Sequence, residues 1–154
     1  MGDATRILLL NGPNLGGLGR RKTDVYGVKT LADVEAEVRA EISPGGWELV
    51  SEQREGEGEL IHVLQEHRDV AGAIVNPGAL MIAGWSLRDA LEDFPPPWVE
   101  VHISNVWARE EFRHSSVLSP IASGVVAGFG TLGYRLAARA LVEIVDAAPT
   151  DAPG

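Results

Sequence analysis

The sequence contains no cysteine. Disulfides, thiol nucleophiles and cysteine-based metal sites are therefore excluded. It also contains no apolar run near the roughly 20 residues that a membrane-spanning helix needs. The apolar run closest to the start, at residues 7–10, is short and comes after Asp3, so no signal peptide is predicted. We expect a soluble, cytoplasmic protein with no membrane partner.

Positive charge is scarce, because 13 Lys and Arg face 22 Asp and Glu and give a formal net charge of −9. Nucleic-acid binding depends on cations that neutralise phosphates, so no nucleic-acid partner is predicted. The length of 154 residues and the 45% hydrophobic content fit one ordinary globular domain. We place that domain at residues 1–146. Residues 147–154, with two prolines and no periodicity, are expected to be a frayed tail.

Several familiar site motifs are missing or incomplete. The four histidines lack metal-ligand spacing, no HExxH occurs and no GxSxG elbow occurs, so no metal and no serine nucleophile are predicted. Residues 128–133 (GFGTLG) match the GxGxxG pattern of dinucleotide sites. The acidic residue that should follow on a strand about 20 residues later is absent, since Asp151 lies in the tail. These glycines are expected to serve close strand-to-helix packing.

Short apolar runs alternate with helical patterns along the chain. This alternation predicts a parallel sheet covered by helices on both faces and joined by right-handed crossovers. The fold class is α/β, a three-layer flavodoxin-like fold with a five-stranded parallel sheet. The expected strands cover residues 7–10, 47–50, 71–75, 98–103 and 125–127, and the expected helices cover 30–42, 57–66, 86–94 and 131–145.

Polar residues follow the predicted strands. In open parallel sheets, ligands bind beyond the carboxyl ends of the strands. Those ends carry residues 11–14 (NGPN), 53–54 (QR), 76–78 (NPG) and 102–105 (HISN). The site is therefore predicted at this edge of the sheet.

The segment after the first strand combines glycines with cations. Residues 16–22 (GGLGRRK) suit a mobile flap over an anion, although a solvated loop has the same composition. Guanidinium groups near Tyr26 would lower the pKa of its phenol, and such a tyrosine can act as a general base. Simple packing is the alternative interpretation of Tyr26.

Two further pairs stand at the carboxyl-terminal edge. Glu100 and His102 share one face of a strand, so the carboxylate can orient the imidazole and favour its cation. A hydrogen-bonded structural histidine is the alternative. Arg109 and Arg113 are four residues apart and would share one side of a helical turn, where they could clamp a carboxylate. Surface pairing with a neighbouring glutamate is the alternative for them.

Taken together, these segments resemble type II 3-dehydroquinate dehydratase. The resemblance covers nearly the whole chain, and its NGPNL and EVHISN stretches are highly specific. The matching stretches are LLLNGPNLGGLGRRKTDVYG (8–27), EGELIHVLQE (57–66), NPGAL (76–80), LRDAL (87–91), EVHISNVWAREEFRHSSVLSP (100–120) and GVVAGFGTLGYRLAARAL (124–141).

The resemblance implies a flavodoxin-like subunit that assembles with copies of itself into a dodecamer of four trimers. It implies a hydro-lyase of the shikimate pathway that needs no cofactor. The reaction implied is the anti elimination of water from 3-dehydroquinate through an enolate, which gives 3-dehydroshikimate.

The resemblance also implies roles for the residues around the base. Tyr26 matches the tyrosine that removes a proton from the carbon next to the ketone. Arg21 matches the flap arginine that keeps this base ionised, and Arg109 adds positive charge. Asn14 matches the residue that holds a water against the enolate oxygen.

On the acid side, His102 matches the group that protonates the departing hydroxyl, and Glu100 matches the residue that orients it. Asp89 matches an aspartate that reaches into the site of a neighbouring subunit. The groups implied to grip the substrate are Asn76, the backbone of Ile103 and Ser104, and Arg113.

One stretch departs from the family pattern. The family follows NPG with a Thr-His-Thr-Ser stretch, but this chain has Met81, Ile82, Ala83 and Gly84, and Ile82 takes the place of a histidine that binds substrate hydroxyls. Trp107 stands where a second histidine is often found. The departure leaves open a diverged enzyme acting on a related cyclic hydroxy-ketone in secondary metabolism, or a weakly active or non-enzymatic assembly protein.

Overall fold

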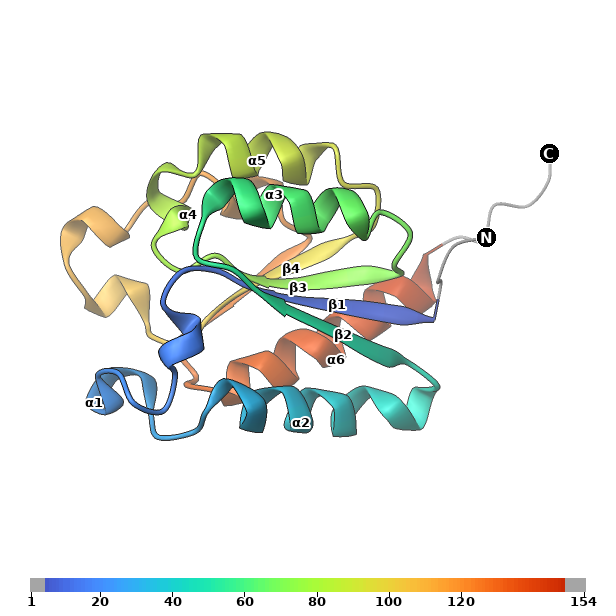
Figure 1. The fold of residues 1–154 in the computed structure, drawn as a ribbon, viewed down its shortest axis with the longest axis horizontal. Helices are drawn as coiled ribbons and strands as arrows, with labels where there is room; N and C mark the ends of the chain where they lie inside the picture. The colour runs from blue at the N-terminus through green and yellow to red at the C-terminus, as the bar shows by residue number, and fades with distance from the viewer. Residues whose placement is uncertain (1–4, 149–154) are drawn as a thin grey trace.

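The computed structural model describes residues 5–148 and contains a five-stranded, all-parallel sheet with the strand order β2-β1-β3-β4-β5 (Figure 1). This arrangement confirms the predicted three-layer α/β fold. The strands are β1 (Arg6–Asn11), β2 (Glu48–Gln53), β3 (Gly72–Asn76), β4 (Trp98–His102) and β5 (Gly124–Ala127).

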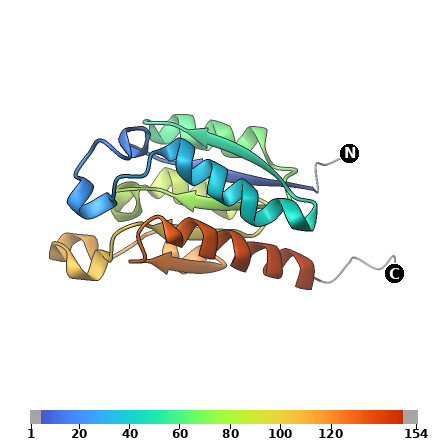
Figure 2. The same cartoon turned by 90° about the horizontal axis from the view of Figure 1, so that it is seen from below.

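Helices cover both faces of this sheet. Helices α2 (Leu31–Ile42) and α6 (Leu132–Ala147) lie side by side on one face, as Figure 2 shows. Helices α3 (Glu57–Glu66) and α5 (Trp85–Glu92) lie on the other face (Figure 1). The predicted helix 57–66 agrees with α3 at both ends.

The unbroken apolar run in β1 follows from this double coverage. Ile7 and Leu9 belong to the core under α2 and α6, whereas Leu8 and Leu10 belong to the core under α3 and α5. Side chains alternate between the two faces of a strand, so a strand buried on both faces needs apolar residues at every position.

Some boundaries differ from those predicted. Strand β2 continues to Gln53, three residues beyond the expected end, because its polar residues pair in register with β1 up to Asn11. It is an edge strand, where polar side chains are tolerated. Ala147, the first residue of the expected tail, is the last residue of α6. Residues 149–154 of that tail lie outside the described residues.

Two short helices, α1 (Thr23–Tyr26) and α4 (Leu80–Ala83), have no periodic signal in the sequence. Both follow a carboxyl end of a strand and form part of the site described below. One helical turn is too short to show the spacing of an amphipathic helix.

The glycines after β5 serve close packing, as predicted. Gly128 and Gly130 have φ angles of 93° and 62°, which favour glycine. A Cβ atom on Gly133 would lie 3.3 Å from Val101 Cγ2, which is tighter than an ordinary contact. Among residues 5–148, no helix is both long and apolar enough to cross a membrane.

Thr30 begins α2 with a capping box. Its Oγ1 accepts from the Asp33 N–H at 3.1 Å, and Asp33 Oδ2 accepts from the Thr30 N–H at 2.9 Å. Replacing Thr30 with alanine should cost about 1 kcal/mol and lower Tm by about 2–4 °C. Thermal unfolding measures the change. Thr30→Ser, which keeps the acceptor, should stay near the original Tm, and equal losses in both variants would contradict the capping role.

Candidate active site

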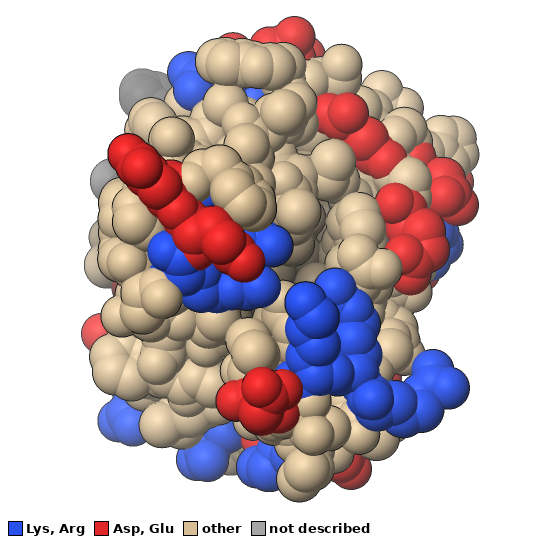
Figure 3. Space-filling view, turned by 90° about the vertical axis from the view of Figure 1, so that its left-hand side faces the viewer, with Lys and Arg blue, Asp and Glu red and all other residues tan. Residues whose placement is uncertain are grey.

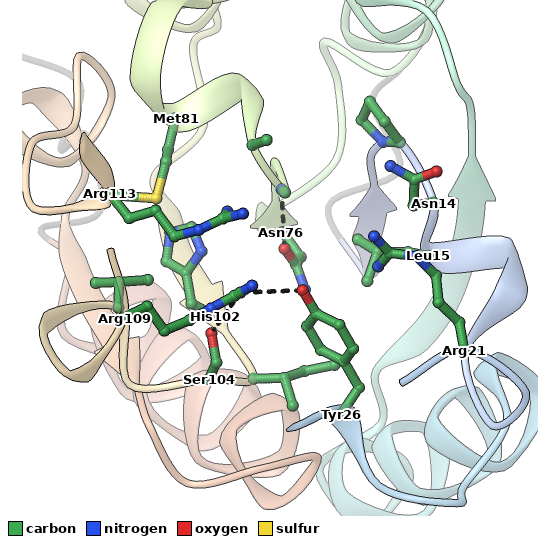
Figure 4. A pocket seen from close by; sticks show the side chains of 15 residues that line it. Asn14, Leu15, Arg21, Tyr26, Asn76, Met81, His102, Ser104, Arg109 and Arg113 are labelled. Atoms are coloured by element: carbon green, nitrogen blue, oxygen red, sulfur yellow. Dashed lines mark hydrogen bonds between the residues drawn. The ribbon is translucent and has the colours of Figure 1, made fainter. Parts of the chain in front are cut away.

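A cavity opens at the carboxyl ends of β1, β3 and β4 (Figure 4). Polar side chains from separate parts of the chain meet there, as the strand-end rule predicts. Its lining includes most of the residues singled out in the sequence: Asn14, Arg21, Tyr26, Asn76, His102, Ile103, Ser104, Arg109 and Arg113. Pro13, Leu15, Gly78, Ala79, Met81 and Val106 complete the lining.

Tyr26 lies between two guanidinium groups at this cavity. Arg109 Nη1 donates to the Tyr26 hydroxyl at 3.0 Å, and the Arg21 guanidinium carbon lies 5.2 Å from the ring centroid. Burial raises the pKa of Tyr26, but the hydrogen bonds and charges of Arg109 and Arg21 outweigh it and hold this pKa below the ordinary value. The phenol is therefore prepared to lose its proton and to act as a base.

The two arginines at residues 109 and 113 do not share one helical turn, so that part of the prediction is wrong. Arg109 is extended and lies between two 3-10 turns, Val106–Ala108 and Glu111–Arg113. Its guanidinium group contacts Tyr26 and also Ser104 Oγ, at 3.3 Å. Arg113 Nε pairs with Glu110 at 2.5 Å while its side chain still lines the cavity. The extended backbone at Arg109, between the two turns, directs its side chain to the Tyr26 hydroxyl.

Strand β4 carries a buried, hydrogen-bonded pair of titratable residues, of which His102 lines the cavity. Glu100 is 0% exposed and His102 is 6% exposed, and His102 Nε2 hydrogen-bonds to Glu100 Oε2. The second carboxylate oxygen accepts from the Ser119 hydroxyl at 2.7 Å. Because Nε2 is occupied, Nδ1 is the ring nitrogen left to exchange a proton with a ligand.

Ser119 was not among the predicted site residues. It approaches Glu100 from a 3-10 turn, Ser119–Ile121, 19 positions further along the chain, so no local spacing connects the two residues. Its presence in the matched stretch 100–120 is the one sequence signal that could have drawn attention to it.

Asn14 and Asn76 come from neighbouring strand ends and lie at the cavity (Figure 4). Asn14 has a φ angle of 71°, and its N–H donates to Glu55 Oε2 at 2.9 Å. That bond, together with one from Gln53, holds the pKa of the Glu55 carboxyl below its usual value. Asn76 is 3% exposed, and its Oδ1 accepts from the Gly78 N–H at 3.1 Å. Hydrogen bonds thus hold the chain in place after β1, at Asn14, and after β3, at Asn76.

Residues 81–84, which depart from the family pattern, contribute Met81 to the wall of the cavity but not Ile82. Met81 is 5% exposed and lines the cavity, whereas Ile82 is absent from the lining. Successive side chains in a helix point about 100° apart, so only one of two adjacent α4 residues faces inward. The role of Ile82 in binding substrate stays a prediction. Asp89 lies exposed on α5 and is also absent from the lining of this cavity.

The surroundings of the cavity are cationic although the chain as a whole is acidic. Figure 3 shows lysine and arginine side chains on both sides of the hollow. The three arginines Arg21, Arg109 and Arg113 belong to its lining. Within residues 5–148, no group of three or more histidine, aspartate or glutamate side chains could hold a metal ion. The site favours a small anion.

Comparisons with known proteins agree with this geometry. The family model described as Dehydroquinase class II matches residues 5–142. A 3-dehydroquinate dehydratase from Corynebacterium pseudotuberculosis is 50% identical over 139 residues, 88% of this chain and 95% of the relative. A 3-dehydroquinate dehydratase from Bacillus cereus (strain G9842) is 45% identical over 139 residues, 90% of this chain and 95% of the relative.

Among solved structures, the type II dehydroquinase from Propionibacterium acnes superposes with a TM-score of 0.84 at 36% identity. The superposition covers 95% of this chain and 99% of the other. The fold and the strand-end site define an α/β protein built for acid–base chemistry on a small anion. The chain belongs to the class II dehydroquinase family.

The two tyrosines of the chain should titrate far apart. Arg109 and Arg21 lower the pKa of Tyr26, whereas burial raises the pKa of Tyr134 beyond its ordinary range. The ultraviolet absorbance of tyrosinate should therefore rise in an early step that Tyr26→Phe abolishes. Arg109→Gln should move that step to higher pH, because it removes both a donor and a positive charge.

Arg113→Gln is the matched control for this titration. Arg113 lines the same cavity but does not contribute to the lowered pKa of Tyr26. Its removal should leave the early step in place. An early step that is unaffected by Arg109→Gln would show that Arg109 does not control the phenol.

Proposed function

We propose that the protein dehydrates 3-dehydroquinate to 3-dehydroshikimate, as a hydro-lyase of the shikimate pathway. The observation that carries this proposal is that one cavity lined by three arginines holds two groups suited to proton transfer. Tyr26 accepts a hydrogen bond from Arg109, and His102 is hydrogen-bonded to Glu100. The names of the relatives and the family membership support the same reaction.

Tyr26 acts as the base in this reaction. Its phenolate removes a proton from the carbon next to the substrate ketone, and the electrons of the broken C–H bond move onto the ketone oxygen as an enolate. Asn14 helps to hold a water against this oxygen. Preorganised dipoles and the nearby Arg21 and Arg109 charges stabilise the negative charge as it develops.

His102 acts as the acid. The enolate collapses to form the C=C bond and breaks the C–O bond of the hydroxyl, which leaves as water after His102 donates its proton. Glu100 balances and orients the imidazolium. Because the base comes from α1 and the acid from β4, the two can act on opposite faces of one ring, as an anti elimination requires.

The remaining polar groups bind the substrate. Arg113 and Asn76 receive its carboxylate, and the backbone of Ile103 and Ser104 receives further oxygens. The chemistry needs only proton transfers, so it takes no cofactor.

We propose further that the chain works in the cytoplasm as a dodecamer of four trimers, in which Asp89 reaches the site of a neighbouring copy. The surface supports self-association, because several large apolar side chains are exposed. Contact with another copy would remove the apolar surface of such side chains from water. These side chains are Val28, Trp85, Trp107, Phe112 and Phe129.

The central test is an assay with 3-dehydroquinate that follows the absorbance of the conjugated enone. Tyr26→Phe should lower turnover by roughly 10²–10⁴-fold, the scale of general-base catalysis, and should leave the fold intact by circular dichroism. His102→Ala should also be folded and nearly inactive. Full activity in His102→Ala would make this histidine structural.

The same assay decides between the shikimate-pathway enzyme and a diverged one. A specificity constant of about 10⁴–10⁸ M⁻¹s⁻¹ is typical of natural substrates and is the result we expect. Because Ile82 does not line the cavity, Ile82→His should bring no gain. A very low constant that Ile82→His raises would instead favour a related cyclic hydroxy-ketone as the true substrate.

Light scattering tests the assembly. The native mass should be a multiple of the 16.4 kDa subunit, and Asp89→Ala should lower activity without changing that mass. A residue supplied across a boundary makes the site a property of the oligomer. An active monomer of 16.4 kDa would contradict the assembly and the role of Asp89 together.

A further inference from the structure

A buried tyrosine on α6 connects the ends of two neighbouring strands. The Tyr134 hydroxyl is 0% exposed, donates to Asn11 Oδ1 at 2.6 Å and accepts from Asn76 Nδ2 at 2.7 Å. Asn11 and Asn76 are register partners at the carboxyl ends of β1 and β3. We propose that Tyr134 is a positioning residue that sets the direction of the Asn76 carboxamide, an inference that rests on the proposed role of Asn76 in binding substrate.

The direction of this hydrogen-bond chain is fixed at its first member. The Gly78 N–H donates to Asn76 Oδ1, so Nδ2 must lie on the other side of the amide. Nδ2 can only donate, so the Tyr134 oxygen accepts from it. The single hydroxyl hydrogen is then directed to Asn11 Oδ1. The reverse direction would set the Gly78 N–H against an NH₂ group.

The consequence for the cavity is one free donor. Nδ2 of Asn76 carries two hydrogens, and Tyr134 takes one. The second has no acceptor within the described part of the chain, and Asn76 lines the cavity. A carboxylate accepts hydrogen bonds only, so an amide that presents N–H matches it and a turned amide that presents C=O repels it.

A contribution to stability alone does not account for the hydrogen bonds that join Asn11, Tyr134 and Asn76. Among the described residues, the Nδ2 atom of Asn11 is buried without a hydrogen-bond partner. Buried polar atoms are rarely left unpaired, because each one lowers stability. Asn11 offers its oxygen to Tyr134 and leaves its own NH₂ group unpaired, which preserves the direction of the chain at the expense of one bond.

Tyr134→Phe removes only the hydroxyl oxygen and tests the proposal. The Asn76 amide then loses one of its two anchors and can rotate. Substrate binding should weaken in the ground state and the transition state alike, so KM for 3-dehydroquinate should rise roughly tenfold with kcat little changed. In an Asn76→Ala background, Tyr134→Phe should change KM by less than about twofold, because coupled residues are not additive.

Leu141→Ala is the matched control for a purely structural effect. Leu141 lies on the same helix, is fully buried and packs on Gly72 at the opposite end of β3. Leu141→Ala should lower Tm at least as much as Tyr134→Phe does, and it should leave KM unchanged. Equal changes of KM in both variants, or additive effects with Asn76→Ala, would overturn the positioning role.

A crystal structure of Tyr134→Phe separates this proposal from the proposed function. It should show the Asn76 carboxamide turned or in more than one orientation, whatever the substrate is. Absence of wild-type turnover on 3-dehydroquinate would overturn the proposed function alone. An unmoved Asn76 amide would overturn the role of Tyr134 even in an active enzyme.

Discussion

The hydrogen bond from Arg109 to Tyr26 is the interaction on which the site depends. A phenol is an effective base near neutral pH only if its ionised form is favoured, and burial alone acts in the opposite direction. Arg109 supplies both a donor and a charge, and Arg21 adds a second charge. In the loop between β4 and β5, the first 3-10 turn ends just before Arg109. The position of that turn therefore decides whether the Arg109 side chain can reach Tyr26 in α1.

His102, the proposed acid, requires the opposite electrostatic environment to Tyr26. Glu100 supplies negative charge to its imidazole, and the Ser119 hydroxyl donates to the second oxygen of that carboxylate. A buried carboxylate is tolerated only when such partners are present. The proposed base and acid can thus share one cavity because each has its own charged partner, Arg109 for Tyr26 and Glu100 for His102.

Much of this could be predicted from the sequence. Alternating apolar runs and helical periods predict the three layers, and the strand-end rule predicts where the cavity lies. Local spacing failed where the chain is irregular, because Arg109 and Arg113 occupy two separate 3-10 turns. Contacts between distant segments, such as Tyr134 with Asn76 over 58 positions, leave no periodic signal.

The net charge of −9 gives a limited view of what the protein binds. It argues against a polyanion, because a long phosphate backbone experiences the field of a whole surface. A small carboxylate inside a cavity experiences chiefly the nearest groups, and those are Arg21, Arg109 and Arg113. Fields focused in a cleft can raise the local concentration of such a ligand even when the remaining surface is acidic. The distribution of charge, and not its sum, therefore selects the substrate.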